Sequence, residues 1–252
     1  MKKRIDGLEV NYIDEGTGRP LVFLHGWGTS AANMWPLAEA FSERHRVIVL
    51  DFPGFGESVR PEATWKVMDY AQFLVKFLAE LGIERPHALI GHSFGGRVSI
   101  KALGTGLLES DKLILIDSAG VKPSDSMRKL AYKLIAKSGK AALSAPGLRR
   151  FSSKARAKLY ESAGSTDYMN AEGMRDILIA TVGEDLKENA KTITVPTLIV
   201  WGSEDKETPL SDARFFHTAS AGSQLKIIQG AGHFAHTDAP RKVARFMREF
   251  LG

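Results

Sequence analysis

The stretch Gly91-His92-Ser93-Phe94-Gly95 decides how this chain is expected to fold. It follows an apolar run at 88–90 and precedes a helical pattern at 96–103, so it joins a buried strand to a helix. A serine at such a junction sits on a turn so sharp that the flanking positions need residues without side chains. Gly91 and Gly95 meet this need. The stretch therefore predicts a serine hydroxyl lifted clear of the backbone.

Apolar runs on both sides of this stretch predict the rest of a sheet. The runs alternate with helical patterns, which favours a mostly parallel sheet with helices on both faces. They lie at 21–24, 47–50, 88–90, 113–116, 198–200 and 225–228. Ahead of them, 4–13 is typical of a hairpin that turns at Asp6-Gly7 and adds an antiparallel edge. Helices are expected at 64–81, where Gly82 ends the pattern, and at 239–251.

Composition excludes several classes of protein. The 252 residues are 44% hydrophobic and 25% charged, as in a globular protein with a full core. The chain has no cysteine, which excludes disulfides, thiolate nucleophiles and cysteine-ligated metals. The basic N-terminus lacks the apolar stretch of a signal peptide, and no run approaches the ~20 apolar residues of a membrane span. We expect a cytoplasmic protein.

Charge is concentrated in one segment. The net charge is +5, yet 121–160 alone holds eleven Lys or Arg against one acidic residue, Asp125. The strand pattern is missing from 121–193, which predicts an inserted helical segment between core segments 1–120 and 194–252. The favoured interpretation of the basic residues is a solvated helical face, and weak contact with anionic lipid or anionic substrates is the second. Nucleic acid is not expected as a partner because no stacking aromatic residues interleave the charges.

Further motifs extend the argument beyond the serine. They are His25-Gly26-Trp27-Gly28, the segment 51–58, Trp201-Gly202-Ser203-Glu204-Asp205 with Pro209, and Gly232-His233-Phe234. With the serine stretch, they make the chain resemble the α/β-hydrolase fold family, in the branch with a helical cap after the sixth strand. The resemblance covers essentially the whole chain. It implies an eight-stranded, mostly parallel sheet and a cap at 121–193.

A serine nucleophile needs a base, and His233 is the best placed of the seven histidines. It lies in a glycine-rich loop directly after the last predicted strand. His236 is its one serious rival. His92 is expected to point away from Ser93 on the sharp turn, and His45, His87 and His217 fall at the ends of predicted helices or strands.

The base needs an orienting carboxylate, for which the resemblance indicates Asp205, giving the chain order Ser, Asp, His. Asp117 is the alternative because it ends the sixth strand, where some family members carry this acid. We expect Asp117 to have a structural role. Glu204 and Glu207 are expected to lie in a solvated loop.

The resemblance also implies an oxyanion hole made by the backbone N–H groups of Trp27 and Phe94. His25 is expected to brace the loop that carries Trp27. Candidate pocket residues beside these donors are His25, Phe52, Phe55 and Phe234. The segment 51–58 lacks the lysine of a phosphate-binding loop and is expected to be structural. No metal and no cofactor are predicted.

The sequence thus predicts a carboxylesterase-like serine hydrolase that cleaves small to medium carboxylic esters. A C–C bond hydrolase of the meta-cleavage product type shares the fold and the order of the triad, but those enzymes usually carry Trp where Phe234 stands. A ligand receptor on the same fold, with slow or no turnover, is the alternative from another class. Dehalogenases and epoxide hydrolases are disfavoured because their nucleophile is Asp and Ser93 stands here.

Overall fold

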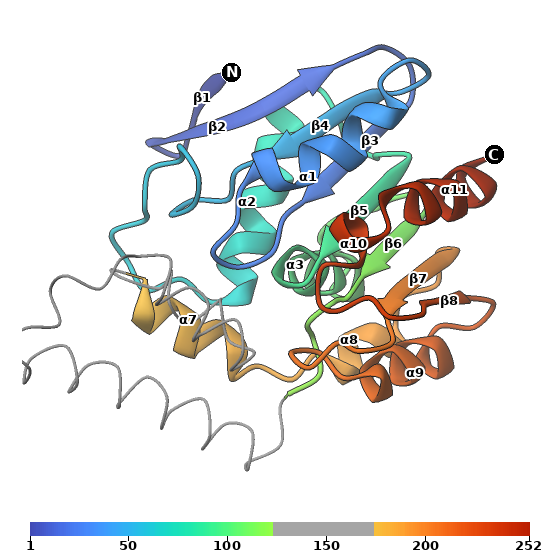
Figure 1. The fold of residues 1–252 in the computed structure, drawn as a ribbon. Helices are drawn as coiled ribbons and strands as arrows, with labels where there is room; N and C mark the ends of the chain where they lie inside the picture. Colours follow the sequence, from blue (N-terminus) through green and yellow to red (C-terminus); the bar gives the residue numbers. More distant parts are fainter. Residues whose placement is uncertain (123–173) are drawn as a thin grey trace, which may run out of the picture.

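Figure 1 shows the computed structural model of the chain, which describes residues 1–122 and 174–252. One eight-stranded sheet with strand order β1-β2-β4-β3-β5-β6-β7-β8 runs through the described residues. Its strands are β1 (Lys2–Ile5), β2 (Leu8–Glu15), β3 (Pro20–Leu24), β4 (Arg46–Leu50), β5 (Ala88–His92), β6 (Leu113–Ile116), β7 (Thr197–Gly202) and β8 (Gln224–Ile228). β3 to β8 are parallel, and β1 and β2 are antiparallel to their neighbours. The predicted mostly parallel sheet is confirmed.

Helices cover both faces of the sheet, as predicted (Figure 1). One face carries α1 (Ala31–Ala38), the short 3-10 helix η1 (Glu39–Phe41) and α11 (Pro240–Leu251), with α10 (Ala235–Asp238) beside them. The other carries α2 (Val67–Glu80), α3 (Phe94–Gly104), α8 (Lys187–Lys191) and α9 (Leu210–Ala219). The strands β3 to β7 are almost entirely buried because both faces of the sheet are covered there, which is why their sequences are nearly continuous apolar runs. β8 at the edge is only partly buried.

The antiparallel edge begins with a tight hairpin. Asp6 and Gly7 have φ angles of 49° and 83°, as both central residues of a type I′ turn must. The turn predicted at these two residues is therefore confirmed.

Parallel strands end at one edge of the sheet, and this edge collects the candidate residues. Ser93 follows β5, Asp117 follows β6, Asp205 follows β7 and His233 follows β8. Residues from segments up to 140 positions apart can therefore meet at this edge.

The predicted cap lies mostly outside the described residues, because 123–173 are not described, and the basic residues of 121–160 other than Lys122 lie in that gap. The end of the predicted insertion forms α7 (Arg175–Val182) and α8. α8 packs against α3 of the core, and the Thr192 hydroxyl donates to the carbonyl of Gly104 at 2.7 Å. Arg97 of α3 donates to the carbonyls of Thr181 and Glu184 at 2.9 and 2.7 Å. The division into core and cap stays a prediction.

None of the described helices is both long enough and apolar enough to span a lipid bilayer.

Candidate active site

The turn at Ser93 has the strained geometry that its sequence predicts. Ser93 has φ of 47°, which few non-glycine residues adopt, and such strain occurs mainly at functional sites. A Cβ added to Gly91 would lie 2.4 Å from the backbone nitrogen of Gly96, and one added to Gly95 would lie 2.1 Å from the carbonyl oxygen of Leu24. Both contacts are with backbone, which cannot move aside. The two glycines are therefore required by the close approach of strand and helix.

Three side chains from distant segments form one line of contacts at this turn. The Oγ atom of Ser93 lies 2.9 Å from Nε2 of His233, and Nδ1 of the same ring lies 2.9 Å from Oδ2 of Asp205. All three residues are buried. An ionised carboxylate can only accept, so Nδ1 carries the proton and donates to Asp205. Nε2 then accepts a hydrogen bond from the Ser93 hydroxyl.

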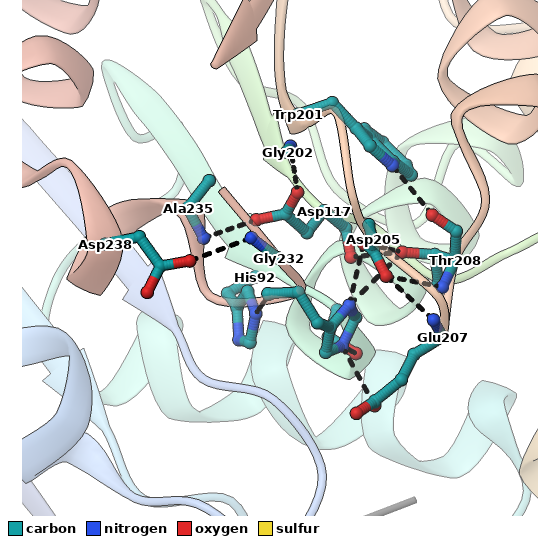
Figure 2. A network of polar contacts seen from close by, with 12 residues as sticks. His92, Asp117, Trp201, Gly202, Asp205, Glu207, Thr208, Gly232, Ala235 and Asp238 are labelled. Atoms are coloured by element: carbon teal, nitrogen blue, oxygen red, sulfur yellow. Dashed lines mark hydrogen bonds and ion pairs between the residues drawn. The ribbon is translucent and has the colours of Figure 1, made fainter. Parts of the chain in front are cut away.

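The carboxylate of Asp205 is held on both oxygens (Figure 2). Oδ1 accepts hydrogen bonds from the backbone N–H groups of Glu207 and Thr208 at 2.8 and 2.9 Å. Oδ2 accepts from the Thr208 hydroxyl at 2.6 Å as well as from His233. These bonds fix the direction of the carboxylate. Sequence reasoning missed Thr208, because nothing in its neighbourhood distinguishes it from an ordinary loop threonine.

Asp117, the alternative acid, faces the backbone of two loops. Its Oδ1 accepts from the N–H of Gly202 at 2.7 Å and its Oδ2 from the N–H of Ala235 at 2.9 Å. Gly202 ends β7, directly before the loop that carries Asp205, and Ala235 begins α10, directly after the loop that carries His233 (Figure 2). Burial raises the pKa of Asp117 to about 8, against the lowering effect of these two hydrogen bonds. The geometry is that of a structural clamp between the two loops.

Two further histidines lie behind His233. Nε2 of His92 donates to the carbonyl oxygen of His233 at 2.8 Å, and the ring of His236 packs on that of His92 with centroids 4.4 Å apart. Burial lowers the pKa of His92 well below its ordinary value and lowers that of His236 to about 4. The ring that lies in contact with Ser93 is that of His233, whereas His236, the rival base, lies against His92.

The loop predicted to supply an oxyanion donor lies against the turn that carries Ser93. A Cβ on Gly26 would lie 3.3 Å from the Cβ of Ser93. Within the described residues, the backbone N–H groups of Trp27 and Phe94 have no hydrogen-bond acceptor, and the two rings pack edge to face at 5.3 Å. An oxyanion hole consists of such backbone donors close to the attacking hydroxyl, so these two N–H groups remain the candidates for it.

His25 braces this loop with both ring nitrogens. Nδ1 donates to the carbonyl of Gly26 at 2.7 Å, and Nε2 accepts from the N–H of Phe52 at 3.0 Å. Since the ring is fully buried, its pKa is lowered, which keeps it neutral and able to accept.

An aromatic cluster fills the space beside the donors. Phe55 packs against Trp27 at 4.8 Å, and Phe52 packs against Phe94 at 5.4 Å. All four side chains are buried. Phe234 is half-buried and packs on the rings of His92 and His233.

The segment 51–58 is held by its first residue. Asp51 is buried, and its oxygens accept from the N–H groups of Ala31 and Glu57 and from the side chain of Asn11. The carboxylate therefore supports a turn. Among the described residues, no three side chains are arranged to bind a metal ion.

Glu207 is the residue that departs most from expectation. Its Oε2 lies 3.5 Å from Nε2 of His233, and Figure 2 shows the Glu207 side chain beside Asp205 and Thr208. Glu204 in the same loop is exposed. The loop turns back over the imidazole because Asp205 binds the N–H of Glu207. A sequence pattern cannot show this turn.

The fold and this edge of the sheet are those of an α/β hydrolase. The family model for the alpha/beta hydrolase family matches residues 21–246, and the chain belongs to that family. It is 26% identical over 262 residues to a 2-hydroxy-6-oxo-6-(2'-aminophenyl)hexa-2,4-dienoic acid hydrolase of Metapseudomonas resinovorans, covering 97% of this chain and 88% of that protein.

Two solved structures show the same fold. An enol-lactonase from Burkholderia xenovorans LB400 superposes with a TM-score of 0.79 at 21% identity and covers 100% of this chain and 99% of that one. A thermophilic esterase from Thermogutta terrifontis superposes with a TM-score of 0.76 at 23% identity and covers 100% and 98%.

Proposed function

We propose that this hydrolase is a serine esterase that cleaves small to medium carboxylic esters through Ser93, His233 and Asp205. The observation that carries the proposal is the unbroken line of contacts from the Ser93 hydroxyl through both ring nitrogens of His233 to Asp205, each 2.9 Å long. A serine hydroxyl is a weak nucleophile, so a base within hydrogen-bond reach is the arrangement that activates it.

In the proposed reaction, Nε2 of His233 takes the hydroxyl proton while Oγ of Ser93 bonds to the ester carbonyl carbon. The resulting oxyanion accepts hydrogen bonds from the N–H groups of Trp27 and Phe94. The imidazolium returns its proton to the alkoxy oxygen as the bond between carbon and that oxygen breaks, which releases the alcohol. Water then attacks the acyl-enzyme with His233 again as base, and the acid and free Ser93 result.

The carboxylate of Asp205 stabilises the imidazolium throughout and stays ionised. Its four hydrogen bonds hold it against Nδ1, so the ring presents Nε2 to Ser93 in both half-reactions. The proposed oxyanion donors belong to residues whose rings join the aromatic cluster. That apolar surrounding favours an apolar acyl group.

A fluorophosphonate probe followed by a chain-length series of nitrophenyl esters tests the proposal. Labelling of Ser93, located by mass spectrometry, together with hydrolysis of the esters is the expected result. The chain length at which kcat/KM peaks measures the acyl site. Failure of both labelling and hydrolysis would overturn the proposal, and labelling with very slow turnover would favour a ligand receptor.

Cleavage of a carbon–carbon bond is the second candidate. The Metapseudomonas resinovorans relative is named as a hydrolase of a 2-hydroxy-6-oxohexa-2,4-dienoic acid and is similar over 97% of this chain. Phe234 stands where such enzymes usually carry Trp, which favours the ester reaction. Rates on a vinylogous 1,5-diketone and on a nitrophenyl ester, measured side by side, separate the two candidates.

A further inference from the structure

Two carboxylates flank the imidazole of His233, one at each nitrogen. Asp205 lies at Nδ1, and Oε2 of Glu207 lies 3.5 Å from Nε2; Figure 2 labels both carboxylates. The same Nε2 also faces Oγ of Ser93. The Glu207 side chain is 17% exposed to solvent, so it lies at the rim of the site, whereas the Asp205 side chain is fully buried. Both carboxylates come from the single loop after β7.

The two carboxylates contact different nitrogens of the ring and have different surroundings. Asp205 accepts from two backbone N–H groups, from Thr208 and from His233, and these bonds hold it on the Nδ1 side of the ring. Glu207 lies beside an atom that changes its state during the proposed reaction. While Nε2 accepts from Ser93 it offers Glu207 no proton, and once Nε2 is protonated the pair becomes attractive.

The position of Glu207 also indicates which half of an ester substrate would lie beside it. In an ester cleavage, Nε2 hands its proton to the alkoxy oxygen of the leaving alcohol, so that oxygen must lie within hydrogen-bond distance of Nε2. A carboxylate 3.5 Å from the same nitrogen therefore lies next to the alcohol half. The acyl half extends from the carbonyl carbon on the other side of the breaking bond.

Among the described residues, the other ionisable groups near the ring are Asp117, His92 and His236. Asp117 binds the backbone of two loops through both oxygens. His92 donates to the backbone of His233, and burial lowers the pKa of His236, which keeps that ring neutral. Of the charged groups that the described residues bring to His233, Glu207 is the one on the Nε2 side.

We propose that Glu207 is a specificity-determining residue that selects esters whose alcohol half is positively charged. The inference rests on the proposed ester hydrolysis and adds the class of substrate. A carboxylate at the rim attracts a cation bound a few ångströms away and repels an anionic alcohol half, and partial burial makes this stronger than at an open surface.

The test uses two esters that differ in charge and little in shape. 2-(Trimethylammonio)ethyl butyrate and 3,3-dimethylbutyl butyrate share the acyl group, and a quaternary nitrogen replaces a quaternary carbon. The ratio of their kcat/KM values is measured in the wild type and in Glu207→Gln, so the intrinsic reactivity of each ester cancels. We expect the ratio to fall about tenfold in Glu207→Gln, and less at high ionic strength than at low.

Glu204→Gln is the matched control because it removes the same charge from the same loop at an exposed position. Its ratio should stay within about twofold of the wild type, since an exposed charge is screened by solvent. Glu207→Asp keeps the charge and draws it back from Nε2, and an intermediate ratio is expected. It also protects the test against a variant that fails to fold.

A pH profile supplies an independent readout. Removing a carboxylate beside Nε2 destabilises the protonated ring, so the acid limb of kcat/KM on the neutral ester should move to lower pH in Glu207→Gln. A purely structural role for Glu207 would leave the limb in place.

An unchanged ratio in Glu207→Gln, or an equal fall in Glu204→Gln, would overturn the inference. If the wild type still hydrolyses the neutral ester, the proposed function is not affected by that result. A wild type that cleaves neither ester and whose Ser93 is not labelled by a fluorophosphonate would instead overturn the proposed function.

Discussion

His92, the residue before Ser93, donates a hydrogen bond from Nε2 to the backbone carbonyl of His233 at 2.8 Å. The turn at Ser93 and the loop that carries His233 are 140 residues apart, yet they are joined twice, once through this backbone contact and once through the Ser93 side chain. The first contact holds the backbone that carries the imidazole. It thereby fixes how far the ring stands from the serine.

His92→Phe should therefore lower kcat/KM about tenfold or more. The change keeps a ring of similar shape and leaves the carbonyl of His233 without its buried donor, a loss of about 1–3 kcal/mol. His92→Gln, which can donate from a similar position, should restore part of the activity. Ester kinetics of the three proteins, with thermal melts to confirm folding, provide the measurement. Equal activity in the Phe and Gln variants would show that the hydrogen bond does not position the loop.

Ser93→Ala should abolish ester hydrolysis, with a loss of about 10⁶-fold if this triad behaves like those studied in detail. Folding should be retained, because alanine needs no more space than serine. Initial rates on a nitrophenyl ester and a melting curve check the two expectations together. Substantial residual turnover by purified, folded Ser93→Ala would place the nucleophile elsewhere.

Asp205→Asn and Asp117→Asn should have different effects. The first removes the charge that faces Nδ1 and disturbs the ring's tautomer, for which losses in kcat of about 10⁴-fold are typical. The second places an NH2 group against one of two backbone donors, Gly202 or Ala235, and should mainly lower the melting temperature. Values of kcat and melting temperature, measured for both variants under the same conditions, show which carboxylate supports the reaction and which supports the fold. A larger loss of kcat at position 117 would move the orienting acid to the end of β6.

Much of the fold could be predicted because its signals are local. The strands at 21–24, 47–50 and 113–116 are continuous apolar runs, since both faces are buried, and the hairpin turn needs φ above zero at Asp6 and Gly7. Two helices had no such signal. α1 is eight residues long and contains Pro36, and α9 has a polar, weakly patterned surface, so neither shows a clear apolar stripe.

The geometry of the candidate site depended on contacts that no local pattern encodes. Ser93 stands out because the close approach of strand and helix requires glycines on both sides. Thr208 and Glu207 do not stand out, because their positions follow from the way Asp205 binds the next turn of its own loop. The solvated loop expected for both glutamates holds for Glu204 and fails for Glu207.

Acid should destabilise the fold through the buried histidines. Burial lowers the pKa of His236 from 6.5 to about 4, so the unfolded chain binds a proton at a higher pH than the folded chain does. The free energy of unfolding is therefore unaffected by this group above pH 6.5 and falls as the pH drops from 6.5 towards 4. His236 alone should account for about 2 kcal/mol between pH 7 and pH 5, and His92 acts in the same direction. Urea unfolding of the wild type and of His236→Gln at both pH values measures the effect. The variant should lose less stability than the wild type on acidification, and parallel losses in the two proteins would show that His236 does not become protonated on unfolding.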